Sequence, residues 1–139
     1  MAESGGEQRA YAAVHTPALS LVVCTVGRVE PLARLLDSLL AQTRRDFEVL
    51  LVDQNPPGTL DELVARVAGK LDIKHLRSER GLSRARNVGL AAVNGEIVCF
   101  PDDDCWYPTE LVAEVVARFE REGELELIMG QGLAAWLGW

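Results

Sequence analysis

The sequence of 139 residues has only three cysteines and no Cys-x-x-Cys pair. An odd number of cysteines without that spacing argues against a disulfide framework or a zinc site and favours a reducing compartment. No apolar run approaches the roughly 18 residues that a membrane-spanning helix needs. The N-terminal segment carries Glu3, Glu7 and only one basic residue, Arg9, unlike the basic start of a signal peptide. We therefore expect a cytoplasmic protein with no membrane span.

Basic residues and phosphate-binding glycine motifs are also scarce. Lys and Arg number 14 against 21 Asp and Glu, a net charge of −7, which argues against a nucleic-acid or anionic-membrane partner. No Gly-x-Gly-x-x-Gly follows the first predicted strand, and no Gly-x-x-x-x-Gly-Lys-Ser/Thr occurs. Their absence argues against a dinucleotide-binding Rossmann domain and against a P-loop protein.

What the sequence does contain is a regular alternation of two kinds of segment. Short apolar runs predict strands at 19–24, 47–52, 73–76, 96–100 and 125–129. Amphipathic stretches with helical spacing lie between them, and Pro31 and Pro108 are expected at the first position of two helices. Strict alternation predicts an α/β fold, an open and mostly parallel sheet with helices on both faces.

The length supports one domain. We expect a flexible tail over residues 1–17, one domain over 18–131 and an apolar tail over 132–139. The last segment is uncharged and contains two tryptophans. Such an exposed apolar segment suggests a contact between copies of the chain in a homo-oligomer.

Three consecutive carboxylates follow the fourth predicted strand: Asp102, Asp103 and Asp104. In open α/β sheets, ligands bind beyond the carboxyl ends of the strands. Adjacent carboxylates repel one another, and a hard divalent cation, Mg²⁺ or Mn²⁺, offsets that repulsion. The alternative is a solvated acidic turn that caps the helix near Pro108. The position at the end of a buried strand favours the cation.

A basic stretch precedes the fourth strand, where four of the ten residues 77–86 are arginine. Arg84 and Arg86 fall at the start of a predicted helix, where a positive charge opposes the helix dipole. A bound phosphate would offset this mismatch. The alternative is a solvated helix face with scattered arginines.

Asp53 ends the second predicted strand, and Arg28 follows the first. Asp53 at such a position either accepts hydrogen bonds from a ribose or base, or begins the turn at 55–58. The residues leave both interpretations open, and Arg28 has the same ambiguity. His75 has no nucleophile or metal-spaced partner in the sequence, and Cys24 is expected to pack in the core.

Four segments together resemble glycosyltransferase family 2, whose members have the GT-A fold. They are 20–28 (SLVVCTVGR), 52–55 (VDQN), 81–90 (GLSRARNVGL) and 94–104 (NGEIVCFPDDD). The resemblance implies a nucleotide-diphospho-sugar donor, an unknown acceptor hydroxyl, inverting transfer of the sugar, and assistance by Mn²⁺ or Mg²⁺.

The resemblance also implies roles for individual residues. Asp102 and Asp104 correspond to the Asp-x-Asp motif, which holds the metal, with Asp102 also near the donor ribose. Asp53 corresponds to the acid that contacts the nucleobase. The other donor-binding residues that it implies are Thr25, Arg28, Arg84, Arg86, Asn87 and Asp103.

In the family, the acceptor-binding half and its catalytic base lie further along the chain, so we expect a truncated GT-A half that carries the donor and metal site. Two alternatives remain. The first is a non-catalytic nucleotide-sugar-binding module or pseudoenzyme, which would bind the donor without transfer. The second is a metal-dependent nucleotidyltransferase, which would prefer a nucleoside triphosphate.

Overall fold

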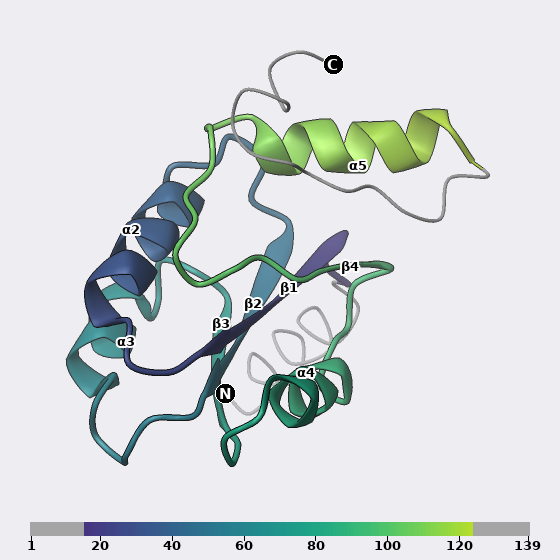
Figure 1. Cartoon of the computed structure of the whole chain (residues 1–139). Coiled ribbons are helices and arrows are strands. Elements are labelled where there is room, and N and C mark those ends of the chain that lie inside the picture. The colour runs from purple at the N-terminus through teal and green to yellow at the C-terminus, as the bar shows by residue number, and fades with distance from the viewer. Residues whose placement is uncertain (1–15, 124–139) are drawn as a thin grey trace, which may run out of the picture.

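A computed structural model describes residues 16–123 of the protein (Figure 1). Strands and helices alternate along this part of the chain, as the sequence predicts. The elements are β1 (Leu19–Thr25), α2 (Val29–Leu40), β2 (Phe47–Asp53), α3 (Asp61–Val67), β3 (Ile73–Arg77), α4 (Leu82–Leu90), β4 (Ile97–Cys99) and α5 (Leu111–Arg121). The predicted strand at 125–129, the apolar tail at 132–139 and most of the predicted N-terminal tail lie outside the described residues.

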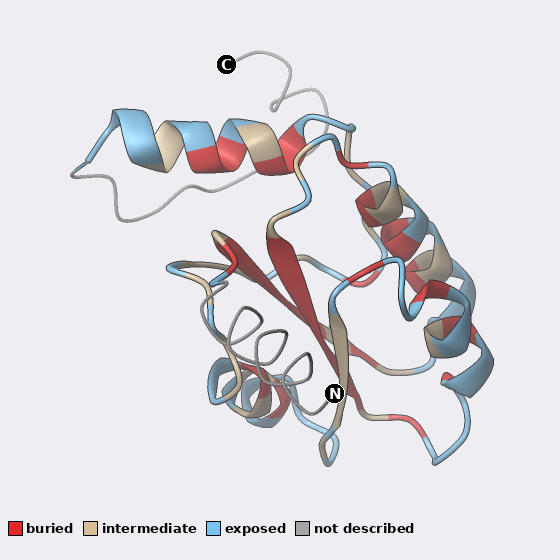
Figure 2. Ribbon diagram, turned by 180° about the vertical axis from the view of Figure 1, so that it is seen from behind, coloured by how far each residue is buried: buried red, intermediate tan, exposed pale blue. Residues whose placement is uncertain are grey.

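The four strands form one sheet in the order β3-β2-β1-β4, and all neighbours are parallel. The two central strands, β1 and β2, are apolar at consecutive positions because helices cover both of their faces. Figure 2 shows these strands as the buried centre of the molecule. The predicted α/β fold, a parallel sheet flanked by helices, is confirmed.

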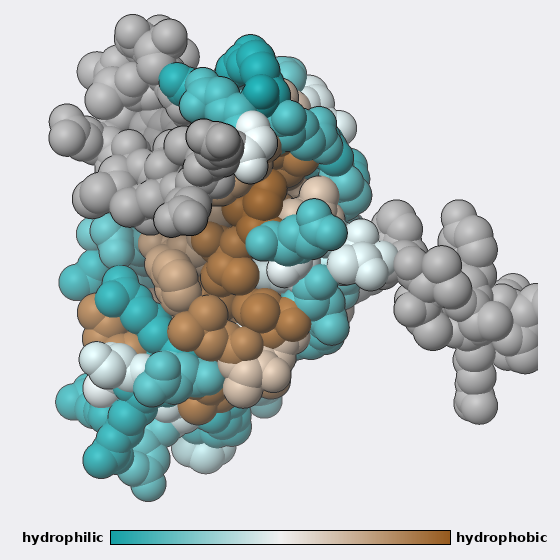
Figure 3. Space-filling model, turned by 90° about the vertical axis from the view of Figure 1, so that its right-hand side faces the viewer, coloured by the Kyte–Doolittle hydropathy of each residue, from teal (hydrophilic) through white to brown (hydrophobic). Residues whose placement is uncertain are grey.

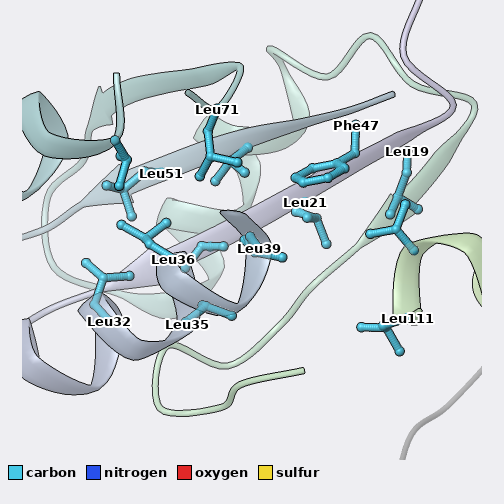
Figure 4. Close-up of a cluster of buried hydrophobic side chains, with 14 of the residues drawn as sticks. Leu19, Leu21, Leu32, Leu35, Leu36, Leu39, Phe47, Leu51, Leu71 and Leu111 are labelled. Carbon is cyan, nitrogen blue, oxygen red and sulfur yellow. The ribbon is translucent and has the colours of Figure 1, made fainter. Parts of the chain in front are cut away.

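Two hydrophobic cores lie on opposite faces of the sheet. The larger core packs α2, α3 and α5 against the sheet, and its α2 side, seen in Figure 4, is built from leucines at helical spacing, namely Leu32, Leu35, Leu36 and Leu39. The smaller core packs Ala85 of α4 against Val22, Leu50 and Val52. Each fully buried leucine contributes about 1.5–3 kcal/mol, so the helical spacing in the sequence accounts directly for the larger core.

The two prolines are not at the first helical position. Pro31 is the third residue of α2, and Pro108 lies three residues before α5 begins. Proline fits inside α2 because the first four N–H groups of a helix have no partner within it. The N-terminus of α5 is stabilised instead from another element, since the Val112 N–H donates to Gln42 Oε1 at 3.0 Å.

Three strands end at the same level of the sheet. Thr25 of β1 pairs in register with Asp53 of β2, and Asp53 pairs with Arg77 of β3. β4 is shorter and borders β1 at an edge of the four-stranded sheet. On the side of the molecule that carries β4, hydrophobic surface lies between hydrophilic borders (Figure 3). Within residues 16–123, no helix is both long enough and apolar enough to span a membrane.

Candidate functional site

A pocket of about 600 Å³ opens at the carboxyl ends of the strands. This volume falls in the range of about 300–1,000 Å³ that is typical of small-molecule sites. One part of its wall is apolar, formed by Val22, Cys24, Val26, Leu82 and Phe100. The other part is charged or polar, formed by Arg28, Gln54, Arg80, Arg86, Asp102, Asp103 and Asp104. The pocket therefore combines a surface for a flat or apolar group with side chains of both charges.

The acidic loop, residues 102–104, is anchored through its middle carboxylate. Asp103 is buried, and its Oδ2 accepts a hydrogen bond from the Thr25 hydroxyl at 2.9 Å. Its Oδ1 accepts from Arg28 at 3.2 Å, and the same nitrogen donates to Asp104 Oδ2 at 3.1 Å. The side chains of Asp102 and Asp104 are exposed. The loop thus fixes Asp103 in the protein and presents its two flanking carboxylates to the solvent.

The donor set of the acidic loop fits a hard divalent cation. Ligand atoms of Asp102, Asp104 and Cys105 lie within 4.8 Å of one another. Burial, followed by the charges of Asp104 and Asp102, raises the pKa of the Cys105 thiol, so the sulfur stays protonated and ligates poorly. Two carboxylate oxygens with open positions beside them suit Mg²⁺ or Mn²⁺. A helix-capping role is not seen, because no side chain of the loop caps α5.

The arginines of the basic stretch divide into two groups. Arg86 lines the pocket from α4, with its guanidinium 5.5 Å from the centre of the Phe100 ring, and Arg80 lines it from the preceding loop. Arg84 instead pairs with Glu79 at 2.6 Å on the exposed surface. Asn87 is exposed on α4 and is not part of the pocket wall. The structure therefore brings Arg86 to the acidic loop and leaves Arg84 and Asn87 outside the pocket.

Asp53 is fully buried and is not part of the pocket wall. Its Oδ1 accepts from the backbone N–H of Asn55 at 2.8 Å, and its Oδ2 lies 2.8 Å from His75 Nε2 and 3.3 Å from Arg77. Burial opposes ionisation, but the hydrogen bonds from Asn55 and His75 outweigh it and hold the pKa of Asp53 below its ordinary value. Asp53 thus organises the turn after β2, and His75 has a carboxylate partner that the sequence did not reveal.

Other residues of the pocket were not singled out from the sequence. Gln54 connects the end of β2 to the start of α4, because its Oε1 accepts from the Gly81 N–H at 3.0 Å. Phe100 follows β4 directly, and Arg80 lies inside the basic stretch, so position alone could have indicated both. Cys24 packs against the smaller core, as expected, and it is only half-buried and also forms part of the pocket wall. Burial raises its pKa despite the nearby Arg86.

Comparison with known proteins identifies the family. The sequence model described as "Glycosyl transferase family 2" matches residues 20–130. The chain belongs to glycosyltransferase family 2. This result confirms the resemblance that the four sequence segments indicate.

Curated relatives and solved structures of this family agree with the assignment. The chain is 30% identical over 116 residues to the uncharacterised glycosyltransferase EpsJ of Bacillus subtilis, covering 81% of this chain and 33% of EpsJ. It is 26% identical to the S. aureus TarS 1–349 structure with UDP-GlcNAc, with a TM-score of 0.68, covering 83% of this chain and 36% of that one. It is also 26% identical to the mannosyltransferase PcManGT from Pyrobaculum calidifontis with GDP-Man and Mn²⁺, at a TM-score of 0.67.

The chain spans about a third of the length of these proteins. The match to PcManGT covers 76% of this chain and 33% of PcManGT. The chain is therefore a member of glycosyltransferase family 2, similar in structure to proteins solved with UDP-GlcNAc or GDP-Man, and its four-stranded parallel sheet corresponds to part of their GT-A fold.

Proposed function

We propose that this domain binds a nucleotide-diphospho-sugar together with Mn²⁺ or Mg²⁺ and takes part in inverting transfer of the sugar to an acceptor hydroxyl. The observation that carries the proposal is one pocket wall on which Asp102 and Asp104 lie beside Arg28 and Arg86. Carboxylates suit the cation, and guanidinium groups suit a diphosphate. The ligands named for two structural relatives, UDP-GlcNAc in one and GDP-Man with Mn²⁺ in the other, support this choice.

In the proposed reaction, the domain's own residues stabilise the leaving group. Asp102 and Asp104 would hold the cation, which would supply positive charge beside the diphosphate leaving group. Arg86 adds a positive charge to the same pocket and is held over Phe100. Thr25 acts indirectly, because its hydroxyl fixes Asp103 and so orients the two flanking carboxylates.

The nucleobase is assigned to the part of the pocket near the end of β2. Gln54 lines the pocket there, and the buried Asp53 holds the following turn through Asn55. Asp53 therefore stabilises this end of the pocket indirectly, through the turn that it holds. Among the described residues, the carboxylates that line the pocket would already bind the cation or Arg28. We therefore assign the base that deprotonates the acceptor to a segment outside residues 16–123.

Thermal unfolding with nucleotides tests the proposal. We expect a Mn²⁺-dependent rise in the melting temperature with one of UDP, GDP, dTDP or ADP, since a ligand at 100 times its Kd adds about 2.7 kcal/mol. Asp102→Asn combined with Asp104→Asn should abolish the rise. Glu62→Gln, on the exposed surface of α3, removes a charge elsewhere and should preserve it.

The same experiment, combined with an assay of nucleoside diphosphate release, separates the alternatives. A larger rise with a nucleoside triphosphate than with any diphosphate or diphospho-sugar would favour a nucleotidyltransferase. Binding of a diphospho-sugar without release of the nucleoside diphosphate, in the presence of acceptors or of water alone, would favour a non-catalytic binding module. No rise with any nucleotide would contradict the proposed donor site.

A further inference from the structure

We infer that Arg28 is an internal counter-ion of the acidic loop. It occupies Asp104 while no divalent cation is bound, yields that carboxylate to the cation, and then turns its guanidinium to the donor's diphosphate. The inference rests on the proposed function, and it adds an exchange of partners at Asp104 that couples cation binding to diphosphate binding.

The two carboxylates that Arg28 contacts are held very differently. One guanidinium nitrogen, NH1, lies 3.2 Å from Asp103 Oδ1 and 3.1 Å from Asp104 Oδ2. The Asp103 side chain is 11% exposed and also accepts from Thr25, whereas the Asp104 side chain is 51% exposed. Asp104's other recorded contact is the thiol of Cys105, at 3.8 Å. The Asp103 side chain is therefore held in place by the protein, through Thr25, even when Arg28 turns away, whereas the Asp104 side chain can exchange Arg28 for a cation.

The cation and Arg28 compete for Asp104. Asp104 is one of the residues whose ligand atoms converge with those of Asp102 and Cys105. A divalent cation bound there would carry two charges close to a guanidinium that contacts the same side chain, and like charges at such distances repel. An exposed ion pair is weak, so the guanidinium gives way.

The side chain of Arg28 can turn while its backbone stays in place. The preceding Gly27 has φ 68°, and its N–H donates to Asn55 Oδ1 at 2.6 Å, which attaches the loop after β1 to the turn after β2. The Arg28 side chain itself is 54% exposed and lines the pocket. Its guanidinium therefore needs only side-chain rotation to reach an anion in the pocket, next to Arg86.

Competition predicts that removing Arg28 has opposite effects on the two ligands. Mn²⁺ alone should bind about two- to fivefold more tightly to the variant. In the native protein, Mn²⁺ first has to break the exposed ion pair between Arg28 and Asp104. Inorganic pyrophosphate should tighten Mn²⁺ binding less in the variant than in the native protein, because the released guanidinium is missing. Pyrophosphate is chosen as probe because it carries the diphosphate without committing to a base or sugar.

The experiment measures Mn²⁺ affinity from the free-ion electron paramagnetic resonance signal, with and without pyrophosphate, and each titration is corrected by the same titration without protein because pyrophosphate itself binds Mn²⁺. The variants are Arg28→Gln, Arg28→Lys and Arg34→Gln. Arg34 is the matched control, because its guanidinium lies 5.3 Å from the Trp106 ring beside the acidic loop and forms no recorded ion pair with an aspartate of the loop. We expect tighter Mn²⁺ binding in Arg28→Gln, near-native binding in Arg28→Lys and native binding in Arg34→Gln.

Each other result has a defined meaning. Equal Mn²⁺ affinity in the native protein and Arg28→Gln, or an equal increase in Arg34→Gln, would overturn the exchange and leave the proposed function standing. Mn²⁺ binding by Arg28→Gln, but by none of the other proteins, would also support the exchange, as the case in which Arg28 excludes Mn²⁺ from the site. No uptake by any of these proteins would overturn both the proposed metal site and the exchange.

Discussion

The hydroxyl of Thr25 donates to Asp103 Oδ2 at 2.9 Å, across 78 residues of sequence. This bond joins the end of β1 to the acidic loop. Both residues are buried, so the carboxylate depends on protein donors in place of water. The arrangement explains how three adjacent aspartates are tolerated: Thr25 and Arg28 hold the middle one inside the protein, and the side chains of the outer two are exposed.

Thr25→Val should destabilise the domain through this bond. The change keeps the shape of the side chain but leaves Asp103 Oδ2 without its donor, at a cost of about 1–3 kcal/mol. Urea unfolding measures the loss. Thr59→Val is the control, because Thr59 is exposed and its hydroxyl bonds only locally to the Pro56 carbonyl at 2.7 Å. Equal losses of stability in the two variants would show that the buried hydrogen bond contributes no more than the exposed one.

Stability should depend on pH through Glu48, at the opposite end of the sheet. Glu48 is buried and accepts from the Ser20 hydroxyl at 2.7 Å and the Asn94 N–H at 2.6 Å, and it pairs with Lys74 at 3.2 Å. Burial opposes ionisation, but these donors hold the pKa of Glu48 below its ordinary value. A lowered native pKa stabilises the fold above the unfolded value of about 4.3, and this contribution is lost as the pH falls through the native pKa.

Glu48→Gln tests this contribution. The variant should unfold more easily than the native protein at about pH 7, by about 1.5–3 kcal/mol, which is the weight of hydrogen bonds to a charged group. The difference should shrink as the pH falls below the unfolded value of about 4.3 and through the lower native pKa, because the carboxyl is then protonated. Denaturant unfolding of both proteins at each pH gives the difference, and a gap that is constant with pH would contradict the role of the charge.

Gly89→Ala should be strongly destabilising although alanine is the better helix former. An added Cβ at this position of α4 would overlap Val22 Cγ1 and lie 3.3 Å from Val52 Cγ2. Valine is stiff at χ1, so the helix has to move off the sheet, and overpacking of this kind costs about 1–3 kcal/mol. Gly123→Ala meets nothing within 4 Å and should be nearly neutral in the same thermal-unfolding assay. Similar melting temperatures for the two variants would refute the close approach of α4 to β1.

Gln42→Leu should loosen the segment between the acidic loop and α5. Gln42 donates to the Pro108 carbonyl at 2.8 Å and accepts from the Val112 N–H at 3.0 Å. Leucine removes the partner of the Val112 N–H, at about 1–3 kcal/mol for a buried group, whereas the Pro108 carbonyl still accepts from the Leu111 N–H at 3.1 Å. Gln42→Glu keeps an acceptor near the N-terminus of α5, where negative charge is favourable, so it should lose less. Hydrogen exchange of the α5 amides checks this order, and equal protection in both variants would contradict it.

The sequence predicts the layout of this domain well because the layout depends on local patterns. Apolar runs and leucine spacing place β1, β2 and α2 to within a few residues. The acidic loop follows from the rule that ligands bind at the carboxyl ends of parallel strands. The boundary errors at Pro31 and Pro108 arise because proline is acceptable throughout the first turn and before it, so it does not mark one position.

The sequence could not predict which site residues face the pocket. Asp53 and Arg86 are both polar residues near strand ends, yet one is buried beneath the turn and the other lines the pocket wall. Pairings across the sheet decide this, such as His75 with Asp53 and Arg28 with the aspartates. They join residues 22 or more positions apart and leave no local signal in composition or periodicity.

The common level at which β1, β2 and β3 end has a consequence for how such a domain can change its substrate. Thr25, Asp53 and Arg77 pair in register across the three strands and so form one rung of the sheet. The preceding residues of these strands pack in the two cores. A deletion of one residue within a strand would turn its inward side chains outward and break the rung. Insertions in the loops that leave the rung would not disturb it. Variation is thus confined to one rim of the molecule, where a new ligand can be selected without redesigning the frame that supports it.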